Sequence, residues 1–381
     1  MSVGLDTQME QWNLDYTEGK IGLREFLNRL PQGQQRFFMF GIPTYNNLGD
    51  QMIGFAQKMF FRNHFPQIQY IEITEPQTDQ AIAELLPQLR SSDMIGFIGG
   101  GNIGSYYLNH ERARRKVFGT FVNNLTISFP QSVNFAKTPQ GRRELGLSQE
   151  AYNKNPNLTL CARETQTFRR FQQYFDNNVL FTGDMVMTLD PLPGKIERDG
   201  VLLIMRHDDE KVTTDDLLAK LTKELRETGR DVEQTDTVVP FKAADGEEGD
   251  PHKSTLKLNE RWQLFTDKLD EIRKSQVVVT DRLHGMIFSV ITQTPCLVFD
   301  NSYGKASTSY YNWFEDLNYI RHTTSTDPQE IIKLVKELEK IKRPNRYYFD
   351  HSYDALLNLI NDHLVIAESI PGRVMNNASD I

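Results

Sequence analysis

The segment Val277–Gly285 carries the clearest signal for chemistry, because its apolar run ends in Thr, Asp, Arg and His. A run rich in valine favours a buried strand, so these polar groups would stand at its carboxyl end. Arg282 and His284 are two residues apart and would face one side of an extended segment. A guanidinium offers a fork to phosphate or carboxylate, and an imidazole offers a proton near neutral pH. The pair predicts an anion site beside a proton donor; a histidine satisfied within the core is the alternative for His284.

Three further cations follow apolar runs in the same way: Arg163, Arg206 and Lys305. Ligands of open α/β sheets bind beyond the carboxyl ends of the strands, so these side chains would face one crevice. Cations gathered in one crevice of an acidic protein favour a small anionic substrate over a polyanion. The alternatives are an ion pair with a neighbouring acid for each arginine and exposure to solvent for the lysine.

A polar, glycine-containing turn covers Gly41–Asp50, after another apolar run. Such a turn presents backbone N–H groups and a helix N-terminus to a ligand, and we expect Asn47 and Asp50 to line the cleft there. Asp50 also suits the capping position of the following helix, so capping is its alternative role.

The segment Gly99–Gly104 contains three consecutive glycines. It fits the dinucleotide spacing G-x-G-x-x-G formally, but residues 119–124 hold no acidic residue that could bind a ribose. We instead expect a loop in which Gly100, Gly101 and Asn102 line the cleft, since glycine allows close backbone approach. A tight turn needed only for packing is the alternative.

The elements that position these residues follow from the hydrophobic pattern. Short apolar runs alternate with amphipathic stretches, which implies βαβ units and parallel sheets. The Pro/Gly-rich stretch 190–200 lacks an apolar period and suits a linker. We predict an α/β fold with two Rossmann-like lobes facing a cleft. The expected parts are an N-terminal extension (1–35), two lobes (36–190 and 200–345), and a C-terminal helix and tail (346–381) that packs back across the first lobe.

Composition narrows the function classes. The chain has 381 residues with 43 basic and 51 acidic side chains, a formal net charge of −8, which argues against a nucleic-acid-binding protein. We find no signal sequence and no run of about 18 apolar residues, as a membrane span needs, and expect a cytoplasmic protein. Cys161 and Cys296 lie in apolar runs and are expected as buried thiols, and no metal site is expected.

Taken together, the motifs resemble the polysaccharide pyruvyltransferase family. The shared segments are N-L-G-D at 47–50, G-G-G-N-I-G at 99–104, F-P-Q-S at 129–132, A-R-E at 162–164, D-R-L-H-G at 281–285 and the lysine of D-N-S-Y-G-K at 300–305. The resemblance implies a GT-B-like fold, phosphoenolpyruvate as donor and two hydroxyls of a sugar as acceptor. It also implies a pyruvate ketal as product, release of phosphate and no cofactor.

The same resemblance implies roles for the cations. Arg282 and His284 match the donor site, Arg163 and Lys305 match functionally important positions, and Arg206 lies in a shorter match. His284 would protonate the methylene carbon of the enol. Arg282, with Arg206 or Lys305, would hold the phosphate and carboxylate and neutralise the leaving charge.

On the acceptor side, Asn47 and Asp50 would face the sugar or assist its deprotonation. The implied acceptor is a lipid-linked oligosaccharide made at the inner face of the membrane, as in exopolysaccharide biosynthesis. Basic residues between Lys333 and Arg346, followed by Tyr347–Phe349, are compatible with peripheral membrane contact; a solvated helix face is the alternative. Two other functions stay open: a GT-B nucleotide-sugar glycosyltransferase, and a non-catalytic glycan-binding or assembly protein.

Overall fold

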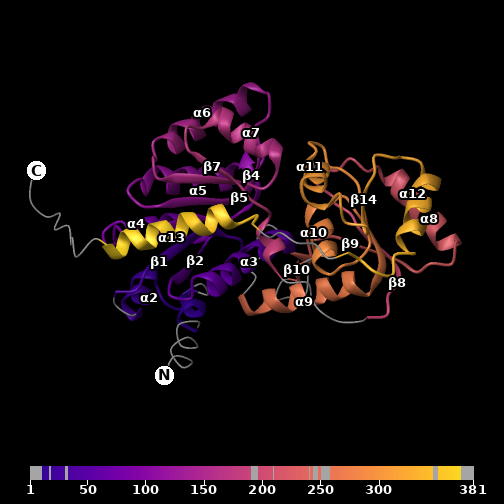
Figure 1. Cartoon of the computed structure of the whole chain (residues 1–381), viewed down its shortest axis with the longest axis horizontal. Coiled ribbons are helices and arrows are strands. Elements are labelled where there is room, and N and C mark those ends of the chain that lie inside the picture. Colours follow the sequence, from indigo (N-terminus) through magenta and orange to yellow (C-terminus); the bar gives the residue numbers. More distant parts are fainter. Residues whose placement is uncertain are drawn as a thin grey trace, which may run out of the picture.

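The protein forms two α/β lobes, each around its own parallel sheet (Figure 1). The structure is a computed structural model, and it describes residues 11–16, 19–30, 33–189, 196–208, 210–239, 241–242, 248–249, 258–345 and 351–369. The predicted α/β class with two lobes is confirmed. It arises because apolar runs form strands buried on both faces, which amphipathic helices then cover. Residues 190–195 of the predicted linker lie outside the described residues.

The first lobe contains a seven-stranded sheet with the order β2-β1-β3-β5-β6-β7, and β4 continues from β3 along β5. The pairings of its strands are parallel. Its strands are β1 (Arg36–Ile42), β2 (Gln69–Thr74), β3 (Met94–Phe97), β4 (Gly100–Gly104), β5 (Thr126–Asn134), β6 (Leu158–Ala162) and β7 (Asn178–Phe181). Every residue of β1, β3 and β6 is buried, as expected for strands covered on both faces.

Helices connect these strands. They are α2 (Leu23–Arg29), α3 (Leu48–His64), η1 (Glu75–Gln77), α4 (Thr78–Leu85), α5 (Leu108–Thr120), α6 (Pro139–Asn153), α7 (Thr165–Tyr174) and η2 (Met185–Thr188). Helix α2 belongs to the predicted N-terminal extension. It buries Leu23, Phe26 and Leu27 in the core of the first lobe, so this part of the extension is integral to that lobe.

The second lobe contains a five-stranded parallel sheet with the order β14-β13-β12-β8-β9. Its strands are β8 (Asp199–Ile204), β9 (Val232–Thr235), β12 (Ser275–Thr280), β13 (Cys296–Val298) and β14 (Ile320–His322), and β10 (Phe241–Lys242) pairs separately with β11 (Glu248–Gly249). Its helices are α8 (Asp215–Glu227), α9 (Leu258–Lys274), α10 (Leu283–Ile291), α11 (Lys305–Ser309), η3 (Tyr310–Phe314) and α12 (Pro328–Leu338).

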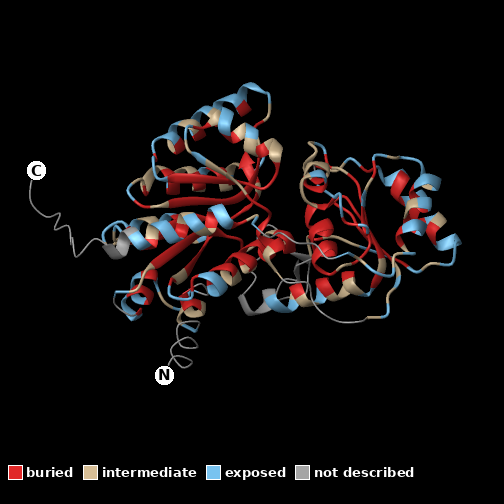
Figure 2. Ribbon diagram, in the orientation of Figure 1, coloured by how far each residue is buried: buried red, intermediate tan, exposed pale blue. Residues whose placement is uncertain are grey.

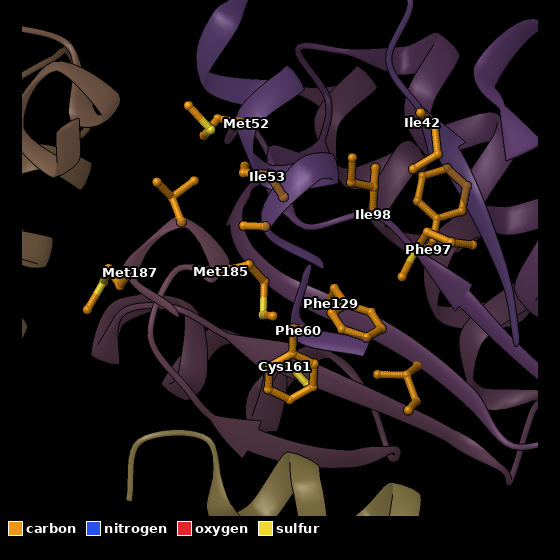
Figure 3. Packing of buried hydrophobic residues seen from close by; sticks show 14 of the residues in the cluster. Ile42, Met52, Ile53, Phe60, Phe97, Ile98, Phe129, Cys161, Met185 and Met187 are labelled. Carbon is orange, nitrogen blue, oxygen red and sulfur yellow. The ribbon is translucent and has the colours of Figure 1, made fainter. Parts of the chain in front are cut away.

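Apolar side chains fill the space between the sheets and their helices. Figure 2 shows the strands of both lobes buried and the outer faces of the helices exposed. In the first lobe, Ile53, Ile98 and Phe129 belong to one packed cluster (Figure 3). Cys161 and Cys296 are free and fully buried, as predicted, and burial raises the pKa of each thiol to about 12.

The C-terminal helix α13 (Asp354–Ser369) returns to the first lobe and lies across it (Figure 1). Leu356, Ile360 and Leu364 join the core cluster of that lobe, because their spacing puts them on one helix face. Tyr353, just before the helix, is also buried there. Within the described residues, no helix is both long and apolar enough to cross a lipid bilayer.

Candidate active site where the lobes meet

The predicted cations all stand just beyond strand ends. Arg163 directly follows β6, and Arg206 and Arg282 each come two residues after a strand, β8 and β12. His284 lies in the first turn of α10, and Lys305 begins α11. The βαβ pattern therefore delivers these side chains to the edge of each sheet where ligands bind in open α/β folds.

Hydrogen bonds join the two lobes around these residues. The loop before α3 pairs with the loop after β9: Leu48 N–H donates to Thr237 O (2.9 Å), and Val239 N–H donates to Asn46 O. Trp313 Nε1–H of η3 donates to the backbone carbonyl of Arg163 (2.7 Å). The cations of the second lobe thus lie directly against the first.

His284 is held between the lobes. A Cβ atom added to Gly49, in the first turn of α3, would come within 2.2 Å of its Nδ1, so the helix backbone lies directly on the ring. Its Nε2 is buried, has no hydrogen-bond partner among the described residues, and lies 3.6 Å from Asp184 Oδ2. The ring is therefore buried where the lobes meet, with Asp184 as its charged neighbour.

Arg163 is fully engaged with acidic and polar groups. Its Nη1 donates to Asp184 Oδ2 (2.7 Å) and its Nε donates to Ser132 Oγ (2.9 Å), which in turn donates to Glu164 Oε2 (3.0 Å). Arg163 therefore forms an ion pair, the alternative that the sequence left open for it. Burial raises the pKa of Asp184, but His284 and Arg163 lower it more, so the net pKa is well below the ordinary value.

Arg206 is 2% exposed and pairs with two carboxylates. Its Nε donates to Asp208 Oδ1 (2.7 Å), and its Nη2 lies 2.6 Å from Glu210 Oε2. Its Nη1 is buried and has no hydrogen-bond partner among the described residues. A buried guanidinium with an unsatisfied donor is expected to gain from an anionic acceptor.

Arg282 presents its fork to protein carboxylates. Its Nε and Nη2 each donate to Asp236 at 2.7 Å, and its Nη1 donates to Asp208 Oδ2 (2.6 Å). Asp208 links Arg282 to Arg206, because it accepts hydrogen bonds from both guanidinium groups.

Lys305 is ion-paired and 14% exposed at its side chain, so the solvent-exposed alternative is wrong. Its Nζ donates to Glu210 Oε2 (2.8 Å) and to Tyr303 Oη (3.0 Å). Glu210 also accepts from Tyr107 of the first lobe (3.1 Å). Burial lowers the pKa of the Lys305 ammonium below its ordinary value, although Glu210 opposes this.

The glycine-rich segment is strand β4, paired with β5, and not the loop that the sequence predicts. Gly100 and Gly104 have φ near +142° and +143°, and a Cβ on Gly104 would meet Asn134 O at 2.0 Å, so packing requires that glycine. A Cβ on Gly101 would lie 3.0 Å from Arg163 Nη2 and 3.8 Å from Lys305 Nζ. Glycine thus lets both cations reach the β4 backbone.

Asn102 takes part in the interior of the first lobe. Its side-chain oxygen accepts a hydrogen bond from Arg114 of α5, a guanidinium that is fully buried. The Arg114 guanidinium also donates to Glu111 Oε2 (2.6 Å). The observed contact of the Asn102 side chain therefore holds α5 against β4.

Asn47, and not Asp50, caps α3: the Asn47 side chain accepts from Gly49 N–H (3.0 Å). The capping alternative for Asp50 is therefore wrong. Asp50 instead accepts a hydrogen bond from Tyr45 Oη (3.1 Å). The Tyr45 ring contacts His110, whose pKa burial and Arg114 lower to about 4.

Sequence reasoning missed the carboxylates that pair with the cations. Asp184 follows β7, a short apolar run, and so carries the signal that identified the arginines, whereas Asp236 follows β9, which has no apolar run. Glu210 lies in the polar loop after β8, and no specific role is predicted for it. Each carboxylate comes from a segment distant from its partner, so local patterns do not reveal the pairing.

Comparison with known proteins places this arrangement in context. A family model described as polysaccharide pyruvyl transferase matches residues 47–303. General stress protein 30 of Bacillus subtilis is 43% identical over 325 residues, covering 85% of this chain and 91% of that protein. Pyruvyl transferase 1 of Schizosaccharomyces pombe is 29% identical over 298 residues, covering 74% of this chain and 70% of that protein.

Among solved structures, Staphylococcus aureus MnaA in complex with UDP has a TM-score of 0.53 at 12% identity, covering 89% of this chain and 99% of that chain. At this identity the likeness concerns the fold alone. It agrees with the predicted GT-B-like arrangement of two lobes, which is confirmed.

Proposed function

We propose, from the premise that the chain belongs to the polysaccharide pyruvyl transferase family and is a transferase, that it moves the pyruvyl group of phosphoenolpyruvate onto two hydroxyls of a sugar. The reaction forms a pyruvate ketal and releases phosphate. One observation carries the proposal. Five side chains predicted from motifs lie together where the lobes meet: Arg206, Arg282 and Lys305 share carboxylates, as do Arg163 and His284, and Arg163 and Lys305 both lie near Gly101.

The set runs through shared carboxylates. Asp208 joins Arg282 to Arg206, and Glu210 joins Arg206 to Lys305. Lys305 and Arg163 approach the same backbone at Gly101, and Asp184 lies between Arg163 and His284. Such a set supports binding of a small ligand that carries both a phosphate and a carboxylate.

In the proposed reaction, His284 gives its proton to the methylene carbon of phosphoenolpyruvate, which leaves C2 electron-poor. One sugar hydroxyl bonds to C2, and the C2–O bond to phosphate breaks. The second hydroxyl then bonds to C2 and closes the ketal. Of the two hydroxyl protons, one returns to His284 and the other goes to the phosphate. Arg206 and Arg282 neutralise the leaving phosphate.

We place the acceptor beside the N-terminus of α3. Asn47 and Asp50 lie there, next to Gly49, which contacts His284. Asp50 would relay one of the two hydroxyl protons toward the leaving phosphate. A lipid-linked oligosaccharide remains the proposed acceptor, used at the cytoplasmic face of the membrane. Of the basic stretch, Lys333 and Lys336 are exposed on α12, whereas 346–349 lie outside the described residues.

Incubation of the protein with phosphoenolpyruvate and a panel of galactosides, glucosides and mannosides tests the proposal. We expect phosphate release together with a product whose mass equals sugar plus pyruvate minus water. Thermal shifts with phosphoenolpyruvate and with nucleotide sugars run in parallel. Stabilisation by a nucleotide sugar alone would favour a glycosyltransferase, and glycan binding that is independent of His284 without phosphate release would favour a non-catalytic protein.

A further inference from the structure

Asp184 is a buried carboxylate that sits between two of the predicted site residues. It comes shortly after β7 and begins η2, where its Oδ1 accepts from Val186 N–H (3.0 Å). It is 3% exposed. Its Oδ2 lies 2.7 Å from Arg163 Nη1 and 3.6 Å from His284 Nε2.

The first lobe fixes the position of this carboxylate. Arg163 and Val186 hold its two oxygens, and the Tyr353 hydroxyl, just before α13, donates to its backbone carbonyl (2.6 Å). His284 belongs to the second lobe. The carboxylate is therefore a fixed reference point in one lobe for an imidazole carried by the other.

We propose that Asp184 is a positioning residue: from its fixed place in the first lobe it orients the His284 ring of the second. The inference rests on the proposed function, because it assumes that His284 gives a proton. A charged carboxylate beside a ring nitrogen of an imidazole attracts its N–H and so fixes the orientation of the ring. Asp184 can do this because it stays charged: Arg163 and His284 outweigh the effect of burial on its pKa.

The surroundings of the ring leave this role to Asp184. The first turn of α3 presents Gly49 to the ring, and on α10 the Phe288 ring lies 5.8 Å away. Arg163 donates a hydrogen bond to Asp184, which lies next to the ring. Asp184 is the charged partner of His284 within the part of the chain that the structure describes.

A structural role is the competing explanation, since Asp184 also neutralises Arg163. Glu164 provides a matched control. It is a second buried carboxylate near the same arginine, with its Oε2 3.8 Å from Arg163 Nε, but its hydrogen bonds go to Ser132 and Thr167 and not to His284.

The experiment compares Asp184→Asn and Glu164→Gln in the full-length protein. For Asp184→Asn we expect kcat to fall by about 10- to 100-fold, because a reacting group that is misplaced by about 1 Å can cost about 100-fold, with little change in the KM for phosphoenolpyruvate. In a His284→Ala background the same substitution should cause no further loss, because residues that act as a unit are not additive. An equal loss in both backgrounds would overturn the proposal.

Histidine ¹⁵N NMR gives a readout that does not need turnover. Asp184→Asn should shift the ¹⁵N signals of the His284 ring, because the ring loses its charged partner, and Glu164→Gln should leave these signals unchanged. Identical His284 signals in Asp184→Asn and the unsubstituted protein would refute the role of Asp184. Failure of the unsubstituted protein to release phosphate would instead refute the proposed function, and the NMR result would still decide the relation between the two residues.

Discussion

At the residue scale, the observed site is a balanced set of ion pairs and not a bare cluster of positive charge. The arginines were predictable because each follows an apolar run within two residues, and Lys305 because it ends the polar loop after another such run. Their partners were not, because Asp236, for example, follows β9, an edge strand with two exposed residues and no apolar run. Ion pairs between distant segments depend on the tertiary fold, which local patterns do not encode.

Arg282→Lys tests the fork at this scale. Lysine keeps the charge but loses the two parallel bonds to Asp236, and it offers a point charge to a phosphate. We expect kcat/KM for phosphoenolpyruvate to fall about 100-fold, equivalent to about 2.7 kcal/mol of transition-state stabilisation. Steady-state kinetics of phosphate release measures this change in kcat/KM.

Arg115→Lys is the control for Arg282→Lys. Arg115 is a similarly buried arginine on α5, paired with Glu144 at 2.7 Å away from the site. Its substitution should lower the melting temperature without lowering kcat/KM. Equal kinetic losses in both variants would show that any buried arginine behaves this way and would remove the special role of the fork.

At the scale of elements, the alternation of strands and helices followed from hydrophobic periodicity, but β4 did not. A segment of glycines and asparagine has low strand propensity, and its pairing with β5 decides its structure. The same strand explains why Gly101 contacts two cations. Tertiary context therefore set both the element and its contribution to the site.

Gly49→Ala tests how α3 positions the imidazole. Alanine normally stabilises a helix relative to glycine by about 1 kcal/mol, but here its Cβ would come within 2.2 Å of His284 Nδ1. We expect the ring to be displaced, with turnover lost and the protein destabilised by about 1–3 kcal/mol. Kinetics and chemical denaturation measure the two effects.

Gly54→Ala, on the same helix, is the matched control. Its Cβ would make ordinary contacts of 3.5 and 3.7 Å with Ile98 and Ile42. This variant should be as stable as the unsubstituted protein or slightly more so, with unchanged turnover. Equal turnover and stability in Gly49→Ala and Gly54→Ala would show that the contact between α3 and His284 has no role in function.

At the scale of the whole molecule, the candidate site is largely buried where the lobes meet. Arg206, Arg282 and His284 are 2%, 8% and 9% exposed, so the proposed reaction would need side chains or lobes to move before substrates enter. The sequence predicted the two lobes but not the contacts that join them, such as Tyr107 with Glu210, because these pair distant segments.

Glu210 makes the joint between the lobes sensitive to acid. Burial raises its pKa, but Lys305 and Arg206 lower it well below the ordinary value. Its stabilising effect is therefore present above the unfolded pKa of about 4.3 and is lost as the pH falls below that value. We expect denaturation curves recorded from pH 7 to pH 3 to show a steeper loss of stability in the unsubstituted protein than in Glu210→Gln.

Asp79→Asn is the control for this pH dependence. Asp79 pairs with Lys116 at the surface and is 72% exposed at its side chain, and exposed pairs contribute little to stability. Asp79→Asn should therefore leave the pH dependence of stability unchanged. If stability fell with pH equally steeply in Glu210→Gln and in the unsubstituted protein, the role of Glu210 where the lobes join would be contradicted.

The central claim is that an imidazole set among paired cations, where the lobes meet, transfers a pyruvyl group. The most direct measurement is phosphate release from phosphoenolpyruvate in the presence of a sugar acceptor, for the unsubstituted protein and for a folded His284→Ala variant. We predict release with a pyruvylated product in the first case and a rate lower by at least about 100-fold in the second. Undiminished release by His284→Ala, at an unchanged melting temperature, would contradict the account.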